Sequence, residues 1–254
     1  MGKIIAIANQ KGGVGKTTTT VNLSAALGAK GKKALLVDVD PQGNATSGLG
    51  VDRRAVKSSV YDMLIGQASA TDILIHTEFE NLDLLPSNMD LAAAELELVD
   101  FEHREARLKA ALMPLRGQYD FVLIDCPPSL GLITTNALCT SDSLLVPIQC
   151  EYYALEGLSQ LMNSVRRVKR QYNDRLEVEG VLLTMYDGRL NLTQQVVEEV
   201  KRFFPRKVFR TVIPRGVRLS EAPSFGKPIL YFDRSCKGSI AYNDLAAEVI
   251  GANR

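Results

Sequence analysis

The sequence predicts an α/β protein with a doubly wound, mostly parallel sheet that carries helices on both faces. Two observations lead to this fold class. Short runs rich in Ile, Val and Leu are apolar at almost every position, which is typical of strands that are covered on both sides. Longer segments with a period of 3.6 residues stand between these runs, and alternation of strand and helix favours a parallel sheet.

Seven apolar runs are predicted as strands. In chain order they are residues 4–8, 34–39, 82–85, 121–124, 143–148, 181–185 and 208–213. Helical spacing is clearest at residues 17–30, 155–172 and 192–204. In the second of these helices one stripe is apolar and is expected to pack in the core. The members of this stripe are Leu155, Leu158, Met162, Val165 and Val168.

Residues 51–116 carry short helical patterns with a weaker strand signal, and we expect this segment to cap one side of the sheet. The chain has 254 residues, 46% of them hydrophobic and 23% charged, which is typical of a soluble globular protein with a sizeable core. No internal repeat or long linker interrupts it. The sequence therefore predicts one domain spanning residues 1–254.

The cysteines and the termini exclude several classes of protein. The four cysteines form no C-x-x-C pair and only two histidines are present, so a zinc or iron–sulfur site is not expected. No basic leader with a cleavage site is visible, and no uncharged stretch approaches 18 residues. We therefore expect a cytoplasmic protein with reduced thiols.

The segment after the first predicted strand carries the strongest chemical signal. It reads N-Q-K-G-G-V-G-K-T-T at residues 9–18 and leads into a helix. Closely spaced glycines let backbone N–H groups turn inward, and the helix N-terminus adds partial positive charge, so this loop suits phosphate oxygens. Lys16 is expected to reach the β- and γ-phosphates, and Thr17 to offer its hydroxyl to Mg²⁺.

The match to the G-x-x-x-x-G-K-[ST] pattern is not literal. Gln10 stands where the pattern has glycine, and an additional lysine, Lys11, precedes Gly12. A glycine-rich turn without a ligand is the alternative interpretation. The strand, the glycines, the Lys-Thr pair and the helix occur together at the expected spacing, which favours phosphate binding.

Carboxylates stand at the ends of two predicted strands, where open α/β sheets bind their ligands. Asp125 follows the run at residues 121–124 and fits the acidic residue that holds Mg²⁺. Asp40 follows the second strand and could orient or activate the attacking water. The alternative for both residues is a structural role as an N-cap or turn former.

Residues 11–17, K-G-G-V-G-K-T, resemble the deviant Walker A box of the ParA/MinD branch of P-loop ATPases. Other blocks resemble the short chromosomal, Soj-like partition ATPases, and together the blocks cover most of the chain up to about residue 247. These blocks are D-V-D-P-Q-G-N at residues 38–44, D-C-P-P-S-L-G at 125–131, Q-C-E-Y-Y-A-L-E-G at 149–157 and V-R-L-S-E-A-P at 217–223.

This resemblance implies a deviant P-loop ATPase in which Mg-ATP drives a monomer-to-dimer switch with two nucleotides sandwiched between protomers. Lys11 is then the signature lysine that reaches the partner's phosphates, Lys16 the P-loop lysine, and Asp40 the catalytic aspartate. Many relatives carry Asn where this chain has Gly216, which puts a side-chain contact to the base in doubt. The resemblance places these residues around the nucleotide: Lys11, Gly12, Gly13, Val14, Gly15, Lys16, Thr17, Thr18, Pro214 and Arg215.

Charge is unevenly distributed although the formal net charge is only +1. Residues 161–220 hold 13 Lys and Arg against six Asp and Glu, a net +7 that leaves −6 for the remainder. Such a segment is what a footprint on the DNA backbone would look like, and a solvated basic face is the alternative. The resemblance favours DNA binding without sequence preference, with Arg189 and Arg218 as the first candidates. Further candidates for DNA contacts are the basic cluster at residues 166–170 and the basic pair at residues 201–202.

The resemblance implies an ATPase that hydrolyses ATP slowly to ADP and phosphate. Hydrolysis would limit how long the protein stays dimeric and attached to DNA, and the result would be segregation of DNA at the nucleoid. A ParB-type centromere-binding protein would stimulate it. No helix-turn-helix precedes the phosphate loop, so operator recognition is not expected. A membrane-cycling, MinD-like regulator remains the main alternative, although the acidic tail at residues 243–254 is unlike a basic membrane helix. An electron-transfer ATPase would need cysteines to bridge a cluster.

Overall fold

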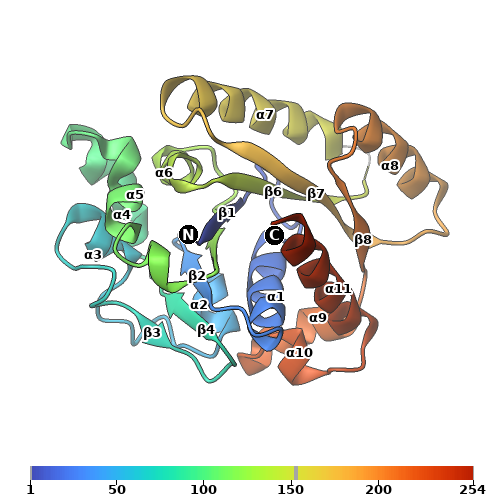
Figure 1. Cartoon of the computed structure of the whole chain (residues 1–254), viewed down its shortest axis with the longest axis horizontal. Coiled ribbons are helices and arrows are strands. Elements are labelled where there is room, and N and C mark those ends of the chain that lie inside the picture. Colours follow the sequence, from blue (N-terminus) through green and yellow to red (C-terminus); the bar gives the residue numbers. More distant parts are fainter. Residues whose placement is uncertain (1, 152–153, 254) are drawn as a thin grey trace.

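A computed structural model describes residues 2–151 and 154–253. One eight-stranded sheet runs through the molecule in the order β3-β4-β2-β5-β1-β6-β7-β8. Every neighbouring pair is parallel except β3 and β4, which are antiparallel. Helices lie on both sides of this sheet (Figure 1). The predicted doubly wound, mostly parallel α/β fold is confirmed.

Strands and helices alternate along most of the chain. The strands are β1 (Lys3–Ile7), β2 (Ala34–Asp38), β3 (Ile75–His76), β4 (Leu82–Leu85), β5 (Phe121–Asp125), β6 (Ser143–Gln149), β7 (Glu177–Tyr186) and β8 (Val208–Pro214). The helices are α1 (Lys16–Ala29), α2 (Asn44–Gly48), α3 (Val60–Ile65), α4 (Leu91–Glu97), α5 (Arg107–Leu112), α6 (Leu132–Thr140), α7 (Ala154–Gln171), α8 (Asn191–Phe203), α9 (Val217–Glu221), α10 (Ile229–Phe232) and α11 (Lys237–Ala252).

The strands divide the core into two layers because successive side chains point to opposite faces. In β1, Ile4 and Ala6 join a cluster that contains the buried side chains of α3 to α8, whereas Ile5 and Ile7 join one formed with α1 and α11. Figure 1 shows the same division, with α1, α9, α10 and α11 grouped away from α6, α7 and α8. Both faces are therefore buried, as the continuous apolar runs predict.

All seven predicted strands are present, and β7 begins four residues before the predicted run. The sequence analysis missed β3, α6 and α11. The segment 51–116 does place α3, α4 and α5 over one face, but it also adds β3 and β4 at the sheet edge. In α7 the expected stripe is buried at Leu158, Val165 and Val168, and Met162 is partly buried, while the side chain of Leu155 lies outside the described residues.

The order of the central strands positions the site. Because β5 lies between β1 and β2, Asp125 at its end is the register partner of both Ile7 and Asp38. The loops that follow β1, β2 and β5 therefore leave the same edge of the sheet side by side, next to the start of α1. An open α/β sheet binds its ligand in this position.

Candidate nucleotide site

The loop between β1 and α1 has the backbone of a phosphate cradle. Gly13 has a φ of 72° and Gly15 a φ of 86°, and Gly15 immediately precedes the first residue of α1. Side chains disfavour this left-handed region, which explains glycine at both positions. The turn directs the N-terminus of α1, with its unpaired N–H groups, toward the carboxyl edge of the sheet.

Distant residues hold this loop in place. The Thr184 hydroxyl on β7 donates to the Val14 carbonyl at 2.8 Å, and the Asn9 side-chain amide donates to the Pro147 carbonyl on β6 at 2.7 Å. The Asn9 side-chain oxygen also accepts the backbone N–H of Lys11 at 3.0 Å. The loop is thus preorganised by β6 and β7, and the anchoring by Thr184 is a contribution that sequence reasoning missed.

Lys16 lies inside the site. Its side chain is buried, and its Nζ donates to the Lys11 carbonyl at 3.2 Å, which curls the loop around the ammonium group. Burial lowers the pKa of Lys16, while the nearby carboxylates of Asp125 and Asp40 act in the opposite direction. A phosphate group beside this ammonium would restore the solvation that burial removes.

Lys11 belongs to the same loop but remains at the surface. Its Nζ forms an ion pair with Glu151 at 3.1 Å, and the side chains of Lys11 and Glu151 are 31% and 48% exposed. Such a pair contributes little to stability, about 0–1 kcal/mol, so it can exchange for another partner. The ammonium group of Lys11 is therefore accessible to an anion that approaches from outside the protomer.

Asp125 is fully buried beside the start of α1. Its two carboxylate oxygens accept the hydroxyls of Thr17 at 2.8 Å and Thr20 at 2.9 Å. Burial and the neighbouring Asp38 raise the pKa of Asp125. Thr17 and Asp125, the two residues predicted to hold Mg²⁺, are thus in direct contact, and Thr20 is an additional partner of Asp125 that the motif did not indicate.

Asp38 and Asp40 occupy the end of β2 in different ways. Asp38 is buried, and its Oδ2 accepts both the backbone N–H and the hydroxyl of Thr46 at 2.8 Å. Asp40 is also buried, but its carboxylate accepts only the backbone N–H of Gln42, at 3.0 Å. The turn-forming alternative is thus present at Asp40, through the N–H of Gln42, although its second carboxylate oxygen has no hydrogen-bond partner among the described residues.

The donor set fits Mg²⁺. Asp38, Asp40 and Asp125 bring three buried carboxyl groups to one edge, against one buried ammonium, that of Lys16, in the described part of the chain. Burial raises the pKa of Asp38 and Asp125, and a divalent cation beside them would favour their ionised forms. Mg²⁺ prefers oxygen ligands and retains several waters, and it is commonly held by one Thr hydroxyl and an acidic strand end. Thr17 and Asp125 are the residues that would hold it.

A cavity of about 610 Å³ opens beside the loop. Gly15 and Thr18 line one side, and Pro214 and Arg215 line the other. Tyr242 from α11 also lines it, with its hydroxyl 3.2 Å from the hydroxyl of Thr19. The structure thus brings the predicted segment at 214–215 next to the loop, while Tyr242 was not foreseen.

The predicted DNA-contacting arginines lie at the carboxyl ends of neighbouring strands. Arg189 follows β7 and pairs with Asp187 at 2.6 Å, and Arg218 on α9 follows β8 and pairs with Glu221 at 3.0 Å. Because Tyr186 and Pro214 are register partners, both arginines leave the same edge of the sheet. Both side chains are exposed, 88% for Arg189 and 59% for Arg218.

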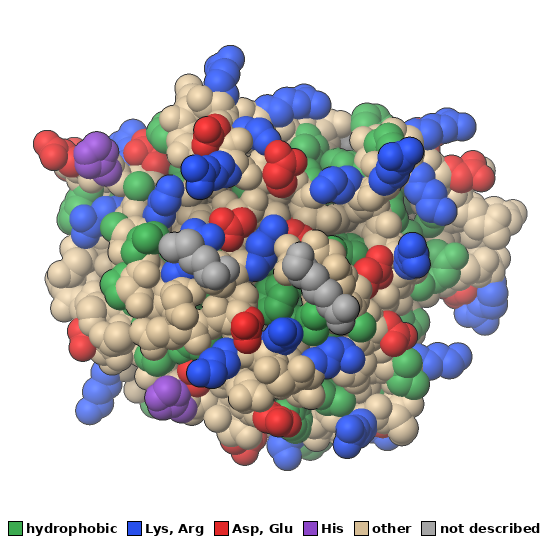
Figure 2. All heavy atoms as spheres, in the orientation of Figure 1, with side chains coloured by type: hydrophobic (Ala, Val, Ile, Leu, Met, Phe, Trp, Pro, Cys, Tyr) green, Lys and Arg blue, Asp and Glu red, His purple; other side chains and the backbone are tan. Residues whose placement is uncertain are grey.

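The further basic candidates do not join these arginines in one patch. Figure 2 shows Lys and Arg side chains gathered over α7 and α8. Arg166 and Arg170 are exposed on α7, which packs on the opposite face of the sheet from α9. Lys201 and Arg202 are exposed in the last turn of α8, and Arg202 pairs with Glu199 at 2.6 Å. The predicted basic segment is therefore spread over two faces.

In the described part of the chain, no helix is long and apolar enough to cross a membrane. All four cysteines carry free thiols, and Cys126, Cys139 and Cys150 are buried. Burial raises the pKa of all three thiols, so they are unreactive at neutral pH.

Comparisons with known proteins identify the family of this chain. Residues 2–178 match the AAA domain family AAA_31. The chain is 61% identical over 249 residues to the sporulation initiation inhibitor protein Soj of Bacillus subtilis, covering 98% of both chains. It is 52% identical to the chromosome partitioning protein ParA of Myxococcus xanthus, covering 98% of this chain and 88% of that protein.

A solved structure has the same fold along nearly the whole chain. It is described as a cobyrinic acid a,c-diamide synthase from Mycobacterium smegmatis with bound ATP analog and magnesium. The TM-score is 0.87 at 38% sequence identity, and the match covers 98% of this chain and 95% of that one. With these similarities along nearly its whole length, and with the phosphate loop built as described, the chain belongs to the Soj/ParA family of chromosome-partitioning ATPases.

Proposed function

We propose that this protein is an ATP-dependent chromosome-partition ATPase whose residues 1–254 act as one domain. ATP binding drives a sandwich homodimer, the dimer binds double-stranded DNA without sequence preference, and slow hydrolysis to ADP and phosphate resets it. The observation that carries this proposal is the grouping at the phosphate loop of two buried side chains, Lys16 and Asp125, with the hydroxyl of Thr17, which donates to Asp125. Family membership supports it independently.

Lys16 and the loop N–H groups bind the β- and γ-phosphates in this proposal, and Pro214 and Arg215 flank the base. The remaining members of the nucleotide set, from Gly12 to Thr18, act through their position in the loop and at the start of α1. Mg²⁺, when bound with ATP at Thr17 and Asp125, neutralises charge that develops on the phosphates. Asp40 orients the attacking water with the oxygen that the Gln42 N–H leaves available.

Lys11 acts across the dimer. Its exposed pair with Glu151 keeps the ammonium at the surface, so the group is available to the phosphates of a partner protomer. Hydrolysis then requires assembly, because the second lysine completes charge neutralisation only in the dimer. In mixed dimers, Lys11→Ala protomers should lower hydrolysis by the partner protomer at least tenfold, as measured by phosphate release; hydrolysis at the wild-type rate would show that Lys11 has no role in trans.

The DNA-binding part of the proposal depends on Arg189 and Arg218 at the carboxyl edge of β7 and β8. This edge also carries Arg215, which lines the base cavity, so nucleotide and DNA contacts lie on neighbouring segments. A ParB-type protein is the proposed stimulator, and the nucleoid in the cytoplasm the proposed location. Similarity to chromosome-partitioning relatives such as ParA of Myxococcus xanthus supports both.

The first experiment is binding to a random-sequence DNA duplex with ATP, with ADP and without nucleotide, each over a salt series. Binding that requires ATP and falls steeply with salt is expected, because affinity from phosphate contacts decreases with a log–log slope of about −0.9 per contact on duplex DNA. The Lys16→Ala variant is the control that removes the nucleotide response. No DNA binding by confirmed ATP dimers would overturn the DNA step, and co-sedimentation of those dimers with liposomes would indicate the membrane-cycling alternative.

A further inference from the structure

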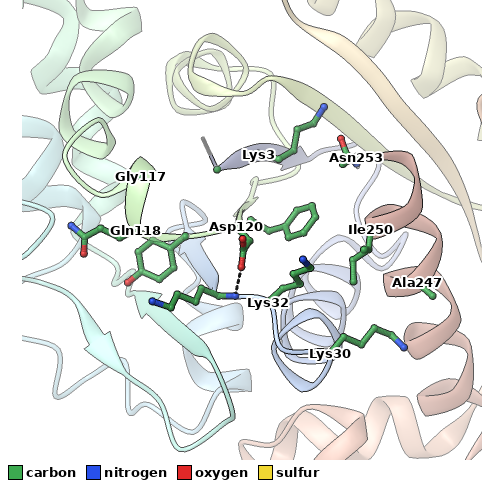
Figure 3. Close-up of a pocket in the computed structure, with 13 residues that line it drawn as sticks. Lys3, Lys30, Lys32, Gly117, Gln118, Asp120, Ala247, Ile250 and Asn253 are labelled. Atoms are coloured by element: carbon green, nitrogen blue, oxygen red, sulfur yellow. Dashed lines mark hydrogen bonds between the residues drawn. The ribbon is translucent and has the colours of Figure 1, made fainter.

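A second cavity opens at the amino ends of the strands, on the edge of the sheet opposite the nucleotide site. Its volume is about 840 Å³, within the range of about 300–1,000 Å³ usual for small-molecule sites. Lys3 at the start of β1, Lys33 before β2 and Asp120 before β5 line it, together with Ile250 and Asn253 from α11. In Figure 3 Lys32 points into the space between β1, α1 and α11, while Lys30 points toward Ala247 and Gln118 lies on the far side of Asp120.

Four lysines contribute to this lysine-lined cavity: Lys3, Lys30, Lys32 and Lys33. Lys3 is neutralised by Glu179 at 3.2 Å, and the same carboxylate accepts hydrogen bonds from Ser143 and Asn253. In the described part of the chain the other three lysines have no ion-pair partner. One acidic residue, Asp120, lines the cavity, and its carboxylate accepts the backbone N–H of Lys33 at 2.8 Å. The lining therefore has a net positive charge.

Capping of α1 does not account for these lysines. Lysines near a helix C-terminus often complete its last carbonyls. Here the Leu27 carbonyl already accepts the backbone N–H groups of Lys30 and Lys32, and the Gly28 carbonyl accepts the N–H of Gly31 and the Asn81 amide. Gly31 has a φ of 74°, a turn that sends the chain directly from α1 into the lysines before β2. Their ammonium groups are not used by the helix end.

We propose that this lysine-lined cavity binds a small polyphosphate-bearing anion of nucleotide size. The ammonium groups of Lys30, Lys32 and Lys33 pair with the phosphates, and Phe121 and Ile250 offer apolar contact to the rest of the ligand. A compact, hollowed site suits a small molecule, whereas duplex DNA needs an extended track of contacts. Because the cavity lies at the opposite edge of the sheet, this site is separate from the ATP site and goes beyond the proposed function.

The test is a titration with inorganic tripolyphosphate, followed by backbone amide NMR shifts and by calorimetry. The Lys16→Ala variant serves as background, so that the phosphate loop does not compete for the probe. If that variant fails to fold, wild-type protein saturated with Mg-ADP replaces it. Shifts at Lys32, Lys33 and Asn253 are expected, and the Lys32→Ala/Lys33→Ala double variant should bind at least tenfold more weakly.

Lys109→Ala, which removes an exposed lysine on α5 far from the cavity lining, is the matched control and should change the affinity less than twofold. An equal loss in this control, or shifts confined to other surfaces, would overturn the proposal. A second titration with a non-hydrolysable nucleoside triphosphate distinguishes the sources: additional shifts at Phe121 and Ile250 with tighter binding indicate a nucleotide, and equal affinity indicates inorganic polyphosphate. If random duplex DNA shifts these amides and tripolyphosphate does not, the small-ligand assignment is wrong.

Discussion

The phosphate loop and the basic surface both concentrate charge, but they hold it in opposite ways. In the loop, Lys16 and Asp125 are buried: Lys16 donates to the Lys11 carbonyl, and Asp125 accepts the hydroxyls of Thr17 and Thr20. On the basic surface, Arg189 and Arg218 are exposed and paired with acidic neighbours two or three residues away. Removing one member of a buried charged pair has a large effect on binding or stability. The remaining partner is left without a hydrogen bond, and water cannot reach it to replace the lost contact. An exposed pair exchanges partners at little cost, which suits reversible attachment.

The largest effect on ATP binding is expected from changing the buried Lys16 in the phosphate loop. Lys16→Ala removes the ammonium that faces the phosphates and leaves the Lys11 carbonyl without its donor. A charge-assisted hydrogen bond contributes about 1.5–3 kcal/mol, so ATP affinity should fall about 10- to 150-fold in calorimetric titration. Arg54→Ala, at an exposed residue outside the site, is the control and should bind ATP normally. Wild-type affinity in Lys16→Ala would remove the lysine from the phosphate site.

Asp40→Ala separates binding from chemistry within the same buried region. Asp40 makes one hydrogen bond to the loop that follows it, so its loss should leave ATP binding nearly intact. Groups that position or activate a nucleophile contribute about 10²–10⁴ to the rate, and steady-state phosphate release should fall by at least 100-fold. ATP dimers should then accumulate in size-exclusion chromatography. Rapid multiple turnover by this variant would contradict a catalytic role for Asp40.

A smaller effect is expected from changing the exposed Arg189 on the basic surface. Arg189→Glu should leave ATP-driven dimerisation unchanged, because Arg189 contacts no residue of the phosphate loop and pairs only with Asp187 among the described residues. DNA affinity should fall about tenfold or more, with the log–log salt slope smaller by about one phosphate contact per protomer. The measurement is fluorescence anisotropy of a labelled duplex with ATP.

Two variants sharpen that measurement. Arg54→Glu makes the same charge change at an exposed arginine outside residues 161–220 and should weaken DNA binding much less. Asp187→Asn removes the competing carboxylate and should strengthen binding by a few fold, because the arginine–aspartate pair lowers the pKa of Asp187 to about 2 and keeps that carboxylate charged. Equal losses in Arg189→Glu and Arg54→Glu would show a general charge effect, and the footprint would then lie elsewhere.

The same contrast explains what the sequence could predict. The loop glycines, Lys16, Thr17 and the acidic strand ends are local patterns, because a strand, a tight turn and a helix specify them within about ten residues. The partners that complete the site come from far along the chain: Thr184 is 170 residues from Val14, and Glu151 is 140 residues from Lys11. Only the order of strands in the sheet brings them together, and no local period encodes that order.

The missed elements have a similar cause. The strand β3 has two residues and pairs antiparallel at the sheet edge, so it is too short to produce a periodic signal. The helix α11 is buried along much of its length because it packs between α1 and β8, and its apolar residues therefore form no narrow stripe. Arg189 and Arg218 of the basic segment are exposed, but net charge along the chain could not separate the two faces that α7 and α9 occupy.

The smallest predicted effect lies where the two regions meet, at Gly216 between the base cavity and α9. A Cβ at this position would meet no atom within 4 Å, and the backbone is extended with a φ of −154°, so a side chain can be added without strain. Gly216→Asn should therefore fold normally and gain one hydrogen bond to the base, strengthening ATP binding about two- to tenfold by calorimetry. Gly216→Ala is the control and should leave affinity unchanged. If both variants bind ATP like the wild type, the base lies beyond reach of this position, and Pro214 and Arg215 alone define that side of the cavity.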